Sequence, residues 1–176
     1  MKKIILTLVA ILAFSFAEAQ SKDVTFGIKG GVQFTNYSGD FADDDGGATG
    51  FYVGGLVDFH ITPMFHIQPE LLYSMEGSEN GGVSYMRIPI MAKIYVSKAF
   101  TIQAGPEVAF KVAAEDDFTD EVVKSTDFGI GIGAGYELPS GLMFDARYNL
   151  GLSNISEVEG ADFKNTGFQI GLGYRF

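Results

Sequence analysis

The sequence predicts an all-β fold, an eight-stranded antiparallel up-and-down transmembrane β-barrel. Three observations predict it: aromatic residues paired at a regular spacing, eight segments in which apolar and polar residues alternate, and links of alternating length. Five aromatic pairs are spaced by eight residues and a sixth pair by ten; in order of position they are Phe26/Phe34, Phe51/Phe59, Phe65/Tyr73, Phe100/Phe110 (the pair spaced by ten), Phe128/Tyr136 and Phe168/Phe176.

The aromatic spacing matches the height of a membrane. An even spacing places both rings of a pair on one face of a strand. Eight residues at about 3.3 Å each, tilted by about 40°, cover roughly 20 Å along the membrane normal. The two aromatic girdles of a membrane barrel flank an apolar band about 25 Å tall. We therefore expect these twelve residues to form the two girdles.

The first residues have the pattern of a signal peptide. Lys2 and Lys3 precede an apolar run over 4–16, and Ala17-Glu18-Ala19 is a small-x-small cleavage site. The run is shorter than the roughly 20 residues that a transmembrane helix needs. We expect residues 1–19 to be removed on export and residues 20–176 to form one barrel domain.

Eight alternating segments follow, at 24–37, 49–61, 64–75, 83–97, 99–113, 126–138, 141–153 and 166–176. The last is the clearest, because apolar residues at 168, 170, 172, 174 and 176 alternate strictly with Gln, Gly, Gly and Arg. Such a period of two excludes a helix. Pro89 and Pro106 fall inside strands, where each removes a ladder hydrogen bond, so we expect bulges there.

The links between these segments alternate in length. Long polar links are expected at 38–48, 76–82, 114–125 and 154–165, and short ones at 62–63, 98 and 139–140. Outer-membrane barrels place their short turns in the periplasm and their longer loops outside. An even number of strands then leaves both ends of the barrel domain in the periplasm.

The long links carry much of the acid. They contain Asp40, Asp43, Asp44, Asp45, Glu115, Asp116, Asp117, Asp120, Glu121, Glu157, Glu159 and Asp162. The favoured interpretation is a solvated surface whose charges repel one another. Divalent-cation binding is the alternative, although Asp43-Asp44-Asp45 lacks the ligand spacing and the turn glycine of a Ca²⁺ loop.

The polar face of the strands is predicted to line the lumen. It is rich in glycine, which makes room in an interior that eight strands leave only just wide enough for side chains. It also carries six bases and six acids in a chain of net charge −10, a balance that a buried charge network requires. The twelve are Lys29, Asp58, Glu70, Arg87, Lys93, Glu107, Lys111, Asp127, Glu137, Asp145, Arg147 and Arg175.

Counting outward from each link predicts approximate partners in this network. Lys29 falls opposite Asp58, and Lys111 falls opposite Asp127. His60 falls opposite His66, and Glu70 lies within diagonal reach of Arg87. A slip of two residues would change these partners without changing the faces.

Several chemistries are disfavoured by the sequence. The chain has no cysteine, so disulfides and thiol chemistry are absent. Its negative charge argues against nucleic acid. The glycines at 129, 131, 133 and 135 alternate strictly and precede no helix, so they do not form a nucleotide-binding loop.

The two histidines are the remaining candidates for chemistry. Asp58, His60 and His66 are expected to cluster inside the barrel, where two His and one Asp could bind Zn²⁺ or support catalysis. No serine has a persuasive position beside either His. We favour histidines that pair with lumen acids, and we predict no catalytic residue, no metal and no cofactor.

Four stretches resemble the PorT-type outer-membrane β-barrel family: Ile28-Lys29-Gly30-Gly31, Gln68-Pro69-Glu70-Leu71-Leu72-Tyr73-Ser74, Ile88-Pro89-Ile90-Met91-Ala92-Lys93 and Gly171-Leu172-Gly173-Tyr174-Arg175-Phe176. The resemblance spans most of the chain after residue 19. It implies a Gram-negative outer-membrane barrel, and some relatives are implied in protein secretion. Phe176 resembles the C-terminal signal that the outer-membrane assembly machinery reads.

The expected function is that of a non-enzymatic structural or interaction protein of the envelope. Its expected partners are outer-membrane lipid, the assembly machinery and an envelope protein that docks on the loops. Two alternatives stay open, a small-solute pore and a lipid-modifying envelope enzyme. A soluble periplasmic barrel with an apolar ligand is disfavoured by the aromatic spacing.

Overall fold

A computed structural model describes residues 23–39, 48–78, 81–114, 125–153 and 163–176. The predicted signal peptide, 1–19, lies outside these residues. So do the twelve acidic residues that the sequence places in the long links.

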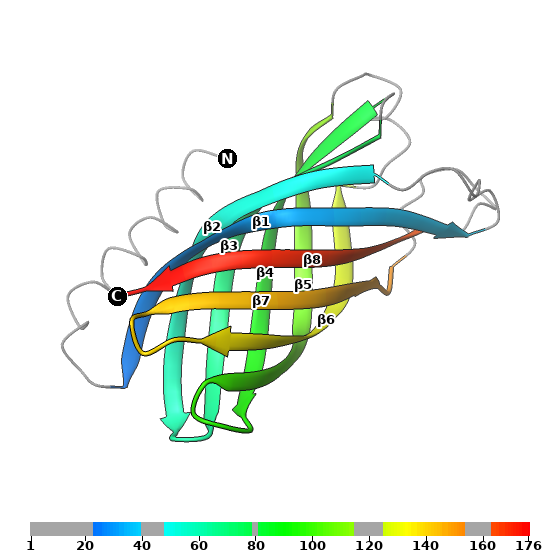
Figure 1. Cartoon of the computed structure of the whole chain (residues 1–176). Helices are drawn as coiled ribbons and strands as arrows, with labels where there is room; N and C mark the ends of the chain where they lie inside the picture. The colour runs from blue at the N-terminus through cyan, green and yellow to red at the C-terminus, as the bar shows by residue number, and fades with distance from the viewer. Residues whose placement is uncertain (1–22, 40–47, 79–80, 115–124, 154–162) are drawn as a thin grey trace, which may run out of the picture.

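The described residues form a closed barrel of eight antiparallel strands, each paired with its neighbours in sequence and the first paired with the last. This confirms the predicted fold. Figure 1 shows the closure, with the first strand in blue beside the last in red. The strands are β1 (Val24–Gly39), β2 (Ala48–Thr62), β3 (Phe65–Ser78), β4 (Gly81–Tyr95), β5 (Phe100–Ala114), β6 (Thr126–Glu137), β7 (Leu142–Gly151) and β8 (Phe163–Arg175).

The three links β2–β3, β4–β5 and β6–β7 are short and lie at one end of the barrel, here called the turn end (Figure 1). The opposite end is called the loop end. One predicted loop-end link is wrong. The sequence suggested a long link over 76–82, whereas β3 continues to Ser78 and β4 starts at Gly81. Glu76 is therefore a strand residue, and it is buried at 1% exposure.

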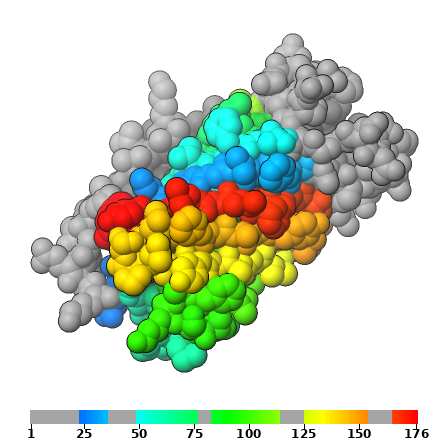
Figure 2. Space-filling view, in the orientation of Figure 1, coloured from blue at the N-terminus to red at the C-terminus, as the bar shows by residue number. Residues whose placement is uncertain are grey.

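Side chains alternate between the lumen and the outer surface along every strand. On β6, for example, Asp127, Gly131, Gly135 and Glu137 are buried, whereas the intervening Phe128, Ile132 and Tyr136 are about half exposed. Figure 2 shows β1, β8, β7 and β6 side by side as a continuous outer surface. The apolar set faces outward, as a membrane barrel requires.

Ten of the twelve predicted girdle residues are exposed on this outer surface: Phe34, Phe51, Phe59, Tyr73, Phe100, Phe110, Phe128, Tyr136, Phe168 and Phe176. Phe65 is half-buried, and Phe26 is only 5% exposed, so Phe26 does not share the exposure of the others. The register aligns Tyr148, Phe168 and Phe34 across neighbouring strands near the loop end. It aligns Phe100, Tyr136 and Phe144 in the same way near the turn end. These two rows form belts across the outer surface.

Glycines make room for large lumen side chains, as the sequence suggested. A Cβ atom at Gly171 would lie 2.1 Å from the hydroxyl of Tyr52 and 2.8 Å from Oδ1 of Asp145. A Cβ atom at Gly131 would lie 3.1 Å from Cδ of Arg147. A larger residue at either position would displace a side chain that fills the lumen.

The prolines do not produce the expected bulges. The pairing register is the same on both sides of Pro89 and of Pro106. Irregularities occur instead between Ser84 and Tyr85 and between His60 and Thr62. Within the described ranges, no membrane-spanning helix is found.

Candidate functional site: the charged lumen

The structure places the predicted charge network inside the barrel. Nine of its side chains are buried: Lys29, Asp58, Glu70, Arg87, Lys93, Glu107, Asp127, Glu137 and Arg147. Asp145, Arg175 and Lys111 are partly exposed. Along the barrel axis the buried charges form three groups, which we name the turn-end, middle and loop-end clusters.

The turn-end cluster consists of Asp58, Lys93, Glu137 and Arg175. The Nζ atom of Lys93 lies 3.2 Å from Oδ2 of Asp58 and also contacts Glu137. The guanidinium of Arg175 lies 3.3 Å from the same Oδ2 and 2.8 Å from Oε2 of Glu137. The hydroxyl of Tyr95 donates to Glu137 at 2.7 Å. Each carboxylate therefore faces both cations.

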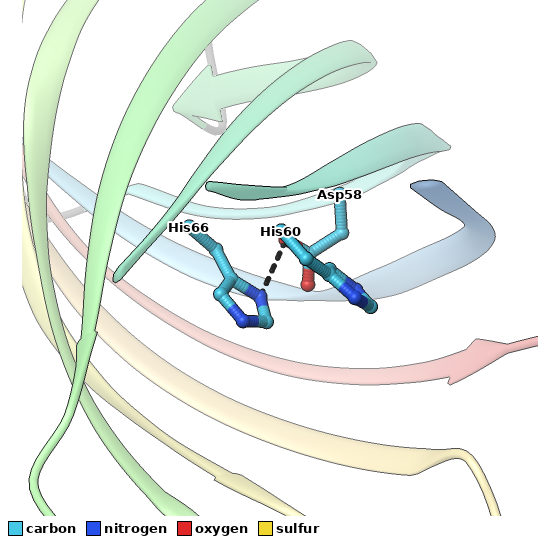
Figure 3. Close-up of side chains that lie close together, drawn as sticks. All are labelled: Asp58, His60 and His66. Atoms are coloured by element: carbon cyan, nitrogen blue, oxygen red, sulfur yellow. Dashed lines mark hydrogen bonds and ion pairs between the residues drawn. The ribbon is translucent and has the colours of Figure 1, made fainter. Parts of the chain in front are cut away.

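Two histidines extend this cluster toward the turn end. Figure 3 shows Asp58, His60 and His66 turned toward one another from β2 and β3. Nδ1 of His66 lies 3.0 Å from Oδ1 of Asp58. The two imidazole rings stack with their centroids 4.2 Å apart, as expected for residues directly opposite each other in the register.

These three residues also have the composition of a metal site. One ligand atom from each lies within 4.8 Å of the others, and bonds to Zn²⁺ are about 2.0–2.2 Å long. However, Lys93 and Arg175 already neutralise Asp58, and two nearby cations oppose a third positive charge. We interpret the trio as a hydrogen-bonded extension of the turn-end cluster.

The same region holds a hydroxyl beside one of the histidines. Oγ1 of Thr25 is 3.3 Å from Nε2 of His60. Sequence reasoning considered only serines beside the histidines and missed this threonine, which pairs with β2 through the register of β1. Because the His60 ring stacks on His66 and that residue in turn binds Asp58, the contact joins the same network of hydrogen bonds.

The middle cluster crosses the lumen. Arg147 on β7 donates two hydrogen bonds to Glu70 on β3, at 2.8 and 3.1 Å, and both side chains are completely buried. Lys29 lies 2.8 Å from Oδ1 of Asp145 and 3.6 Å from Oε2 of Glu70. The amide of Gln68 donates to Glu70 at 2.7 Å. This fork-to-fork pair ties two strands that are not neighbours in the sheet.

The loop-end cluster is centred on Arg87. Its guanidinium contacts Glu76 and Glu107 on either side, and its Nε atom also donates to Oγ of Ser74 at 3.1 Å. Oε2 of Glu76 accepts a hydrogen bond of 2.6 Å from the amide of Asn165.

The predicted partners are mostly wrong although the faces are right. Lys29 pairs in register with Gly54, not Asp58, and Asp127 pairs with Ala109, not Lys111.

Glu70 binds Arg147 instead of Arg87, whose main partner is Glu76. Of the four predicted pairs, the register places only His60 opposite His66.

Sequence reasoning also missed several other lumen side chains, all but one of them uncharged. The lumen side chains that it did not name include Gln33, Gln68, Ser74, Glu76, Gln103, Asn165 and Gln169. Their signal was present, because the alternation of Glu70, Leu72 and Ser74 continues to Glu76. The assumption of a long link over 76–82 hid it.

The clusters leave little space between them. A cavity of about 20 Å³ lies at the loop-end cluster and a second of about 20 Å³ lies between the middle and turn-end clusters. A single water needs roughly 10–15 Å³ by the same kind of measure. The lumen is thus a packed polar core crossed by ion pairs.

Comparisons with solved structures agree with this architecture. Ail, the attachment invasion locus protein of Yersinia pestis, is 16% identical with a TM-score of 0.57, over 88% of this chain and 99% of Ail. The neisserial surface protein A, NspA, is 12% identical with a TM-score of 0.54, over 86% of this chain and 97% of NspA. A de novo designed transmembrane β-barrel is 13% identical with a TM-score of 0.50, over 89% and 98%.

At these identities the likeness shows the fold alone. A comparison with curated protein sequences gives no significant match.

The family is shown by the sequence. A model of the outer membrane protein beta-barrel domain matches residues 5–176. This match, the apolar outer surface and the fold shared with outer-membrane proteins place the protein in the outer membrane. The chain belongs to the family of outer membrane proteins with this β-barrel domain.

Proposed function

We propose that this protein is a non-enzymatic structural and interaction protein of the envelope, of the PorT type and associated with secretion. In this proposal the lumen is closed to solutes and the loops carry the function. Residues 1–19 serve as a signal peptide, and Phe176 acts as the signal for the assembly machinery. The four motifs at 28–31, 68–74, 88–93 and 171–176 support the PorT assignment.

The buried pair of Arg147 and Glu70 is the observation that carries the proposal. Both side chains have 0% exposure in the middle of the lumen, where an open pore would hold water.

The histidines are engaged by Asp58 and Thr25, which supports a structural role. Hydrolysis or acyl transfer on lipid that disappears in both His60→Ala and His66→Ala would contradict the non-enzymatic assignment.

We expect no stepwise conductance when the refolded protein is inserted in a planar lipid bilayer, because the middle cluster blocks the lumen. The double variant Glu70→Ser with Arg147→Ser removes both charges together and leaves neither unpaired. It is expected to show small conductance steps, which also proves that the assay detects this barrel. Steps of similar size in the wild-type protein would favour the small-solute pore.

The interaction role predicts a partner at the loops. A photo-crosslinker in place of Phe118, an apolar residue in an acidic stretch outside the described residues, is expected to give a discrete envelope-protein adduct in cells. The matched control carries the crosslinker in place of Ile132, on the lipid-facing surface. The same adducts from both positions, or none from Phe118, would contradict loop docking.

A further inference from the structure

The loop-end cluster differs from the other two clusters in its charge. The turn-end and middle clusters each contain two carboxylates and two cations. At the loop end, Glu76, Glu107 and Asp127 line one cavity with Arg87, the one basic residue among its described lining residues. Among the described lining residues, three carboxylates thus face one guanidinium, and an excess of buried negative charge is costly unless something compensates it.

Three oxygen atoms at this cavity receive no hydrogen bond in the described part of the chain. They are Oε2 of Glu107, Oδ1 of Asn149 and Oε1 of Gln169. Glu107 is 6% exposed and Gln169 is 2% exposed. Gln169 donates its amide Nε2 to Gln33 at 3.0 Å, so its own oxygen is left facing away from that partner. Buried acceptors are rarely left unpaired, yet none of these three atoms accepts a hydrogen bond from a described residue.

The cavity has room for one such partner. Its volume is about 20 Å³, enough for a single water or a single bare ion. Gly129, Gly151 and Gly167 form part of its wall, so no side chain from these three positions fills it. Most of its lining residues lie on β6, β7 and β8, and Arg87 on β4, which Glu76 and Glu107 hold, lines it as well.

We propose that the loop-end cavity binds one hard divalent cation of the Ca²⁺ class through oxygen atoms of Glu107, Asp127, Asn149 and Gln169. Carboxylate and amide oxygens are the ligands that Ca²⁺ takes, and its flexible coordination suits an irregular cavity better than the strict octahedron of Mg²⁺. Glu107 contacts Arg87 through Oε1, so it bridges Arg87 and the cation with its two oxygens. The inference is independent of whether the lumen conducts solutes.

Calorimetric titration of CaCl₂ into the refolded, chelator-treated protein at physiological salt tests this site. The wild-type protein is expected to bind Ca²⁺ at one saturable site and to need a higher temperature for unfolding in its presence. The isosteric variant Glu107→Gln removes one charged ligand, and we expect its affinity to fall by at least about tenfold. The unfolding temperature of this variant should respond correspondingly less to CaCl₂.

A second variant covers the case in which Glu107→Gln does not fold. Gln169→Lys carries an ammonium group into the cavity, so it is expected to fold and to lose the response to CaCl₂. A triple change of Asp43, Asp44 and Asp45 to Asn controls for Ca²⁺ held by the acidic links, and Asp23→Asn controls for an exposed carboxylate. Both controls should keep the site.

Three results would overturn the proposal. One is a wild-type protein that shows no saturable Ca²⁺ binding, because water or a proton then compensates the cluster. Another is Glu107→Gln or Gln169→Lys with wild-type affinity. The third is loss of binding in the triple link variant alone, which would place the cation outside the barrel.

Discussion

Replacing Arg147 with Met is expected to destabilise the barrel by about 3–5 kcal/mol, because it leaves the buried Glu70 carboxylate without its main partner. Arg147 and Glu70 are both fully buried, and their two hydrogen bonds measure 2.8 and 3.1 Å. Lys29, at 3.6 Å from Glu70, is the remaining cation and is engaged more closely by Asp145. The loss is measured by urea unfolding of the protein in lipid vesicles.

A double variant separates the unpaired charge from lost packing. Arg147→Met with Glu70→Gln leaves no charge alone in the middle cluster, because Lys29 keeps Asp145, and it should recover most of the stability. Arg175→Met is the matched control, since its side chain is 23% exposed and Lys93 still faces both carboxylates that it leaves. A single Arg147→Met variant as stable as the wild-type protein would contradict the role given to this pair.

Replacing Ile132 with Arg is expected to cost about 2–4 kcal/mol, the penalty for a cation on the lipid face at the bilayer midplane. Ile132 is 50% exposed on the outer surface of β6. It lies midway in sequence between the girdle residues Phe128 and Tyr136, so an arginine there reaches neither interface easily. The measurement is again urea unfolding in vesicles, with the free energy compared to that of the wild-type protein.

The same substitution near the end of a strand provides the control. Ile61 is also outward and 59% exposed, but it lies at the turn end of β2, beyond Phe59. Ile61→Arg is therefore expected to cost only about 0–1 kcal/mol, as at other interfacial positions. Equal costs at the two positions, or no cost at Ile132, would argue against a lipid-facing outer surface.

The fold was predictable because its signal is local. Alternation with a period of two defines each strand and separates its faces without knowledge of any partner. The eight strands, their order and the placement of charges on the inner face all follow from this pattern. The pattern was misread at two places. The link expected over 76–82 removed Glu76 from β3, and Pro89 was expected to create a bulge that the register does not show.

The candidate sites were less predictable because they depend on register and closure. A slip of two residues keeps every face and changes every partner, which is why Lys29 and Asp58 were wrongly paired. A bulge between His60 and Thr62 shifts the β2–β3 register, and no residue of the link predicts this shift. The charge balance was also misjudged, since the count of six bases and six acids left out Glu76, which lies buried at the loop end.

The amino-acid sequence alone determined the membrane barrel and its inner and outer faces, because residue spacing along one strand carries that information. Only the tertiary structure decided which charges meet. Closing the barrel brings Arg147 on β7 across the lumen to Glu70 on β3, and it gathers Glu107, Asn149 and Gln169 from three strands around one cavity. The strands of Arg147 and Glu70 share no hydrogen bonds, and the contacts of both groups depend on register and closure, so neither alternation nor link length encodes them.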